Sequence, residues 1–223
     1  HADVYYNSKT GERVHAAFPD GVVDDVNYDG SIRAFLFLLN NDCCTSIDKS
    51  RKFLSDLTGG KLNISKGMVS KLSKEFALKT EPERRSACAD MLLSPVMHTD
   101  CTNARENGKS CYVYVCATPD GKALYFARRK KGHEGVNREG YNLFLRMEKY
   151  MRNHLLFLHD LRIPATNNEA ERLLRNYKRK QAQAVTFRSF ESIDYLCQCM
   201  SMLILMRLEE PANIFDRVSK IFG

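Results

Sequence analysis

The hydrophobic period of this sequence changes twice, and that change is the strongest constraint on its fold. Residues 29–80 carry apolar side chains at helical spacing, residues 95–128 alternate as strands do, and helical spacing returns from residue 137. The predicted strands are 95–100, 111–117 and 122–128, with polar turns at 103–110 and 119–121. Since strands joined by short connections pair as neighbours, we expect a mixed α/β protein with a three-stranded antiparallel meander. Asp100 would close its first strand.

The N-terminal part is predicted to contain a hairpin and linker at 1–28 and a helical module at 29–94. Within the module, Gly59 and Gly60 end one helix, and Ser65 caps the next. A helix, a glycine-containing turn and a capped helix that carries Lys66 and Lys71 form the outline of a helix-turn-helix. Ordinary packing in a helical bundle explains the same outline, so DNA contact by this module is one of two open interpretations.

The composition favours a polyanionic partner. The 223 residues carry a net charge of +7 and have a pI near 9.0, which suits nucleic acid or a membrane surface. The eight cysteines form no CxxC pair and no zinc spacing, so we expect free thiols in a reduced, cytoplasmic setting. The longest apolar run, 195–208, is too short and polar to span a bilayer. The chain begins at His1 without a methionine, so we also expect an upstream segment.

The helix predicted from residue 164 onward combines acids with a basic strip. Its apolar positions Ala170, Leu173, Leu174 and Tyr177 have the spacing of one core-facing stripe. The first turn carries two glutamates, and the continuation carries five cations, which are Arg172, Arg175, Lys178, Arg179 and Lys180. Carboxylates beside cations suit work on phosphates with a divalent metal ion as intermediary.

Asp100 and Glu171 are the candidate metal-binding and catalytic residues. A carboxylate on the first strand and one on a later helix can meet over a sheet, and carboxylate oxygens are the ligands that Mg²⁺ or Mn²⁺ prefers. Taken singly, each acid also has an ordinary structural explanation, Asp100 before a turn and Glu171 near the positive end of a helix. Glu169 competes with Glu171 but lies nearer the solvent end of the helix. His98 shares the face of Asp100.

Basic residues elsewhere are the remaining candidates for DNA contact. Arg128, Arg129 and Lys130 form a run after the third predicted strand, and such a run is more commonly a solvated face than a phosphate site. In the late helix, we assign Arg175, Lys178 and Arg179 to phosphates first, and we leave Leu173, Leu174 and Tyr177 to the core.

Several segments together resemble transposases of the insertion sequence 66 family. The specific part is FLHDLRIPATNNEAER at 157–172, in which Asn-Asn, two residues, Glu and Arg match the family's C-terminal signature. KRK at 178–180, FRS at 187–189 and MHTD at 97–100 are similar to the family's continuation and to its first catalytic strand.

The resemblance implies a ribonuclease H-like α/β catalytic domain at 95–223. The helix-turn-helix-like module precedes this domain, and C-terminal helices complete it. The resemblance also implies an enzyme of the acidic-triad type that cleaves transposon ends and joins them to target DNA with Mg²⁺ or Mn²⁺. Asp100 and Glu171 would be two of the three acids. The implied partners are transposon and target DNA, a second copy of the chain on paired ends, and accessory proteins, all on the nucleoid of the bacterial cytoplasm.

The sequence departs from the family pattern at three places. Cys101-Thr102 stands where Glu-Thr usually follows the first aspartate, and the family's Cys-rich zinc-binding segment is missing upstream. The second catalytic aspartate has no counterpart, because residues 132–136 pass directly into a segment that resembles the late helices. We interpret this as an unshown insertion near 136/137, and a catalytically dead chain is the alternative.

Three functions therefore stay open. The first is a DNA transposase, the second a transposase-derived DNA-binding protein without catalysis, and the third a metal-dependent nuclease on the same core.

Overall fold

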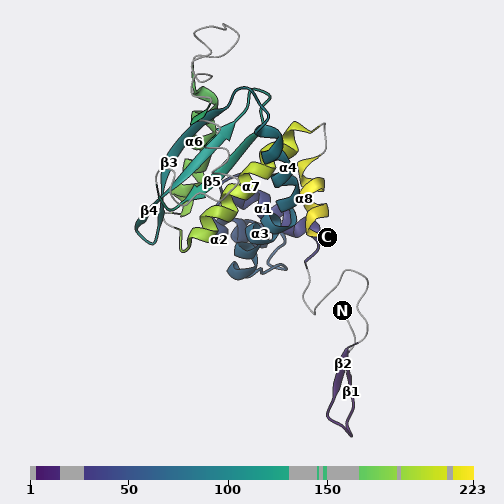
Figure 1. The fold of residues 1–223 in the computed structure, drawn as a ribbon. Coiled ribbons are helices and arrows are strands. Elements are labelled where there is room, and N and C mark those ends of the chain that lie inside the picture. The colour runs from purple at the N-terminus through teal and green to yellow at the C-terminus, as the bar shows by residue number, and fades with distance from the viewer. Residues whose placement is uncertain are drawn as a thin grey trace.

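The computed structural model shows a small antiparallel sheet enclosed by helices (Figure 1). It describes residues 4–15, 28–130, 145, 148–149, 166–184, 187–209 and 213–223. The mixed α/β class expected from the sequence is confirmed. The junction at 136/137, Pro211, the hairpin residues 16–18 and all of the predicted helix at 139–159 except residues 145, 148 and 149 lie outside the described residues.

The sheet has the strand order β3-β4-β5, with β3 at His98–Glu106, β4 at Lys109–Ala117 and β5 at Ala123–Arg128. Both neighbouring pairs are antiparallel, as predicted. A separate two-stranded hairpin pairs β1, Val4–Tyr6, with β2, Arg13–His15.

The first strand of the meander is longer than predicted. The polar segment 103–110 was expected to be a turn, but pairing continues to Glu106 opposite Lys109, and only Asn107 and Gly108 form the connection. Both have positive φ, 46° and 81°, as a two-residue type I′ turn requires. Consequently, Asp100 lies within β3 and does not close it.

Helix α6, Asn168–Ala184, packs on β3 and β4. Its buried side chains Ala170, Leu173, Leu174 and Tyr177 are those predicted for the core, and they meet Val113, Val115 and Tyr125 of the sheet. Alternation along β3 puts Asp100 on the same face as Ala104, which is fully buried in this cluster. The first strand of the sheet therefore presents its acid on the α6 side.

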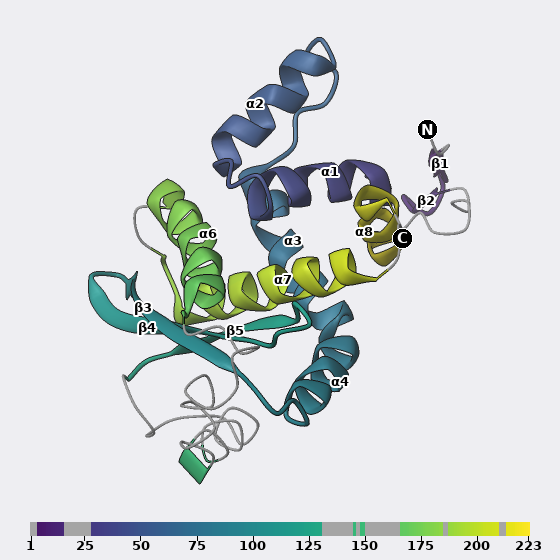
Figure 2. The ribbon, with the colours of Figure 1, turned by 90° about the horizontal axis from the view of Figure 1, so that it is seen from above.

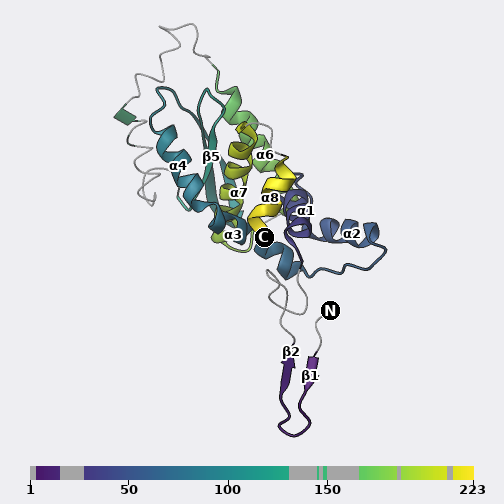
Figure 3. The same ribbon diagram turned by 90° about the vertical axis from the view of Figure 1, so that its right-hand side faces the viewer.

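The N-terminal helices are α1, Gly30–Asn41, α2, Ile47–Leu57, α3, Lys66–Lys79, and α4, Glu81–Met91. The predicted cap Ser65 is confirmed, because its hydroxyl accepts the amide hydrogen of Met68; Ser46 caps α2 in the same way through Lys49. In the views from above and from the side, α4 lies across the sheet from α6 and α7 (Figures 2 and 3).

Helix α7, Phe190–Leu208, belongs to both hydrophobic clusters. It begins after its cap Ser189, runs beside β5, and contacts α3, α4 and α1 as well (Figure 2). The last helix, α8, Ile214–Phe222, packs on α1 and contributes the buried Val218 and Phe222. The helical module thus shares one core with the C-terminal helices.

The cysteines behave as small apolar residues. All eight are free, and Cys88, Cys111, Cys116, Cys197 and Cys199 are buried. Burial raises the pKa of the Cys116 thiol to about 12, which keeps it protonated at neutral pH. Within the described ranges, every helix is too short or too polar to cross a bilayer.

Two tyrosines of the sheet cluster allow a matched test of the core. Tyr125 donates its hydroxyl hydrogen to the Leu173 carbonyl at 2.7 Å, whereas the buried Tyr177 hydroxyl has no partner among the described residues. We predict that Tyr125→Phe lowers the free energy of unfolding by about 1 kcal/mol, while Tyr177→Phe leaves it unchanged or raises it. Urea unfolding of both variants checks this, and equal losses would contradict it.

Candidate functional site

The amino-terminal turn of α6 is hydrogen-bonded to the outer edge of β3. Asn167 donates its side-chain amide hydrogen to the Thr99 carbonyl at 3.0 Å, and its own carbonyl accepts the Glu171 amide hydrogen at 3.1 Å. Further along, Lys178 donates to the Asn103 carbonyl at 2.6 Å. Helix and strand therefore run in the same direction, with Asn167 beside the residue that precedes Asp100.

This alignment places Glu171 near Asp100, about one residue further along β3. Glu171 follows Asn167 by one helical turn, a rise of about 6 Å, which corresponds to about two residues of β3 beyond Thr99. Positions 167, 171, 174 and 178 have the spacing of one helix face, and both ends of that face are bonded to β3. The structure thus brings the two predicted acids to the same side of the same strand.

Asp100 is half-buried and lies opposite Val115 in the register of the sheet. Its Oδ1 accepts the amide hydrogen of Cys101 at 2.7 Å, the residue at which the chain departs from the family pattern. Within the described ranges the other carboxylate oxygen has no hydrogen-bond partner, so it is the one that can accept a ligand.

The two glutamates of α6 have different partners. Glu169 forms a two-bond ion pair with Arg172, at 2.6 and 3.1 Å. Glu171 is half-exposed, and its nearest cation, Arg175, is 3.6 Å away, beyond hydrogen-bond length. Glu169 is therefore held by its arginine, while Glu171 is the more available carboxylate.

The two acids match the chemistry of a hard divalent cation, which prefers carboxylate oxygen. Over the residues that the structure describes, no three His, Cys, Asp or Glu side chains gather into a metal-binding group. The donor set therefore fits the class of ion, and it does not by itself complete a two-ion site.

The basic residues of α6 do not share one face. Arg172, Arg175 and Arg179 are exposed, and Lys178 reaches the edge of β3. Lys180 is buried, with 7% of its surface exposed, and donates to the Asn40 carbonyl at the end of α1. Burial lowers the pKa of Lys180 to about 8, because desolvation disfavours the charged amine.

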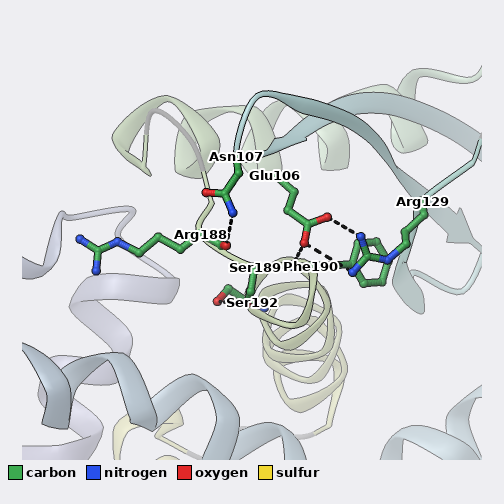
Figure 4. Close-up of polar contacts among 7 residues, drawn as sticks. All are labelled: Glu106, Asn107, Arg129, Arg188, Ser189, Phe190 and Ser192. Atoms are coloured by element: carbon green, nitrogen blue, oxygen red, sulfur yellow. Dashed lines mark hydrogen bonds and ion pairs between the residues drawn. The ribbon is translucent and has the colours of Figure 1, made fainter.

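The run 128–130 is partly used by the fold. Arg128 donates to the Ala127 carbonyl and stacks on Phe126, and Lys130 is exposed. Arg129 pairs with Glu106 at 2.5 Å and lies over the ring of Phe190, as Figure 4 shows. Contact of Arg129 with a phosphate would have to displace Glu106.

The two candidate lysines of the helical module both lie in α3, Lys66 as its first residue and Lys71 further along. Lys66 forms an ion pair with Asp48 of α2 at 2.8 Å, and Lys71 is exposed one turn later. The α3 face opposite is buried through Val69, Leu72 and Phe76.

Two functional candidates were missed by sequence reasoning. Glu106 accepts the Phe190 amide hydrogen at 2.9 Å and so holds the start of α7. Arg188 is fixed by its carbonyl, which accepts from the Asn107 side chain at 2.7 Å, while its guanidinium extends away from this cluster (Figure 4). The Asn107-Gly108 hairpin signal could have indicated Glu106, and the family-like FRS at 187–189 contained Arg188 without giving it a role.

Comparison with known protein families, with curated proteins and with solved structures found no match to this chain.

The hydrogen bond of Asn167 can be tested against its neighbour. We predict that Asn167→Ala lowers the free energy of unfolding by about 1 kcal/mol, because the Thr99 carbonyl loses its donor. Asn168→Ala is the control, since Asn168 is exposed and has no hydrogen bond through its side chain in the described ranges. Chemical denaturation measures both; a loss at Asn168 as large as that at Asn167 would refute the assignment.

The buried amine of Lys180 predicts a pH dependence of stability. Its pKa is about 8 in the folded chain against 10.5 for an unperturbed lysine. Between these values the unfolded state binds more protons, so stability rises with pH, by up to about 3 kcal/mol in total.

We therefore expect the free-energy difference between wild type and Lys180→Met to shift in favour of wild type from pH 7 to pH 10. Lys71→Met, at an exposed position of α3, serves as the control. Denaturant unfolding across this range is the measurement, and parallel curves for wild type and Lys180→Met would show that the amine is not desolvated.

Proposed function

We propose that this chain is a DNA transposase of the acidic-triad type, built on a ribonuclease H-like core, with Asp100 and Glu171 as two of its acids. The observation that carries the proposal is the Asn167–Thr99 hydrogen bond. It joins the segment that resembles the family signature to the strand that resembles the family's first catalytic strand, two regions 68 residues apart.

The topology supports the same assignment. An antiparallel meander in which the first strand carries an acid on the face covered by a late helix is the layout that the resemblance implies. Asp100 and Glu171 would hold Mg²⁺ or Mn²⁺, which supplies charge neutralisation at the phosphate and a more acidic attacking hydroxyl. The chain's own residues would position the acids and the DNA. Asn167 fixes the position of Glu171 along β3, and Arg172, Arg175 and Arg179 are exposed cations on the same helix.

A DNA-binding protein derived from a transposase is the second candidate. The observation that favours it is the short donor set, two acids without a third metal-ligating side chain in the described ranges. The net charge of +7 suits DNA under both proposals.

Substitution of the acids separates the two. We predict that Asp100→Asn and Glu171→Gln each reduce Mg²⁺- or Mn²⁺-dependent nicking and joining by at least about a hundredfold, because even outer partners of metal ligands cost about 10- to 100-fold. Their affinity for DNA should stay near that of wild type. The assay uses labelled DNA that carries the terminal sequences flanking the gene.

Glu169→Gln is the matched control, since it removes a glutamate from the same helical turn but one already paired with Arg172. It should retain activity. Joining at the wild-type rate by either acid variant would refute the site, and salt-dependent DNA binding with no nicking by any protein would leave the binding protein as the function.

A further inference from the structure

A polar groove separate from the acids lies between the helical module and the C-terminal helices. Its volume is about 670 Å³, within the usual range of ligand sites. The end of α1 and the starts of α2 and α3 form one wall, and the end of α6 and the start of α7 form the other.

The groove is lined by three cations and one carboxylate. The cations are Lys66, Lys180 and Arg188, and the carboxylate is Asp48, which is already paired with Lys66 at 2.8 Å. Lys180 is bonded to a backbone carbonyl, and the Arg188 guanidinium has no partner among the described residues. Two positive charges therefore face the groove without a carboxylate.

Three helices begin at this groove, which adds to its positive potential. Ser46, Ile47 and Asp48 line it at the start of α2, Lys66 and Gly67 at the start of α3, and Ser192 in the first turn of α7. The amino-terminal turn of a helix presents amide hydrogens and a partial positive charge, both of which attract phosphate oxygens.

Gly67 is not explained by the fold. Its φ is not positive, and an added Cβ would meet nothing closer than the Ser65 hydroxyl at 3.9 Å. Glycine lowers helix stability, so its place in the first turn of α3 fits close approach of another molecule to the backbone.

The groove opens on the side of α6 away from Glu171. Lys180 follows Glu171 by nine residues, which at about 100° per residue is half a revolution of the helix. The backbone around Arg188 is held by β3 and by the turn after it. The Phe187 amide donates to the Arg105 carbonyl at 3.1 Å, and the Asn107 side chain donates to the Arg188 carbonyl at 2.7 Å. The cation is thus presented from a fixed segment.

We propose that this groove binds the phosphodiester backbone of DNA at a position distinct from the acid pair, with Arg188 and Lys180 as its main contacts. The inference rests on the proposed function for the identity of the polyanion. It adds that binding and phosphoryl transfer occupy opposite sides of α6, so that a change in the groove alters affinity and spares the chemical step.

Arg188→Glu tests the groove, with Arg188→Gln as the milder variant. Fluorescence anisotropy with a labelled duplex should show at least about tenfold weaker binding for Arg188→Glu at about 0.1 M salt, because a charged hydrogen bond is lost and a repulsive charge is added. The slope of log affinity against log salt should decrease by about 1. The joining rate at saturating protein should equal that of wild type.

Arg85→Gln is the control for Arg188→Gln, because it removes one exposed arginine charge from α4, outside the groove. It should bind DNA as wild type does. Thermal unfolding should show that both Arg188 variants are folded, because Arg188 is exposed.

The outcomes distinguish the two proposals. Wild-type affinity and salt slope in Arg188→Glu would overturn the groove and leave the transposase proposal standing. A wild-type protein that binds no DNA would overturn both. Loss of the joining rate at saturating protein would show that the groove is not separate from the acid site.

Discussion

The rest of the structure depends on the packing of α7 beside β5, the last strand of the sheet. The Ser201 hydroxyl accepts the Tyr125 amide hydrogen at 2.8 Å, so α7 supplies a hydrogen-bond acceptor to the outer edge of β5. The same helix buries Ile193 and Cys197 against the sheet cluster and Met202 and Met206 against the helical module. Because one helix serves both clusters, the module, the sheet and α6 keep fixed positions, and a groove between α3 and α6 can exist.

At the opposite edge of the sheet, two side chains and one backbone amide supply hydrogen-bond donors to β3. Asn167, Lys178 and the Phe187 amide supply donors to the carbonyls of Thr99, Asn103 and Arg105. The bonds of Asn167 and Lys178 orient α6 along β3, and they explain why the segment with the family-like signature needs asparagine and lysine as well as its acids. The proposed catalytic geometry and the bonding of this edge therefore depend on the same contacts.

Local signals in the sequence were sufficient for most helices and insufficient for tertiary placement. Ser65 was correctly predicted as a cap because a cap bonds within its own turn. The length of β3 was missed because the polar segment 103–110 outweighed the Asn107-Gly108 turn signal. Extending the apolar stripe of α6 by three residues from Tyr177 would have placed Lys180 inside, yet the basic run suggested a surface. The position of Arg188 depends on the bond of Phe187 to β3 and on the bond of Asn107 to the Arg188 carbonyl, which no local pattern encodes.

The two sides of α6 impose different electrostatic demands. On the β3 side, the positive charge of Arg175 lies near Glu171. A divalent cation that binds Glu171 would have to overcome repulsion by this arginine. On the far side, Lys180 loses hydration without gaining a carboxylate, a cost that the fold bears with a single carbonyl bond. A phosphate in the groove would supply the missing counter-charge in a partly dry setting, where such a pair is stronger than at the surface. Binding of DNA would thus relieve a strain that the free protein carries, whether or not the acids on the other side complete a catalytic site.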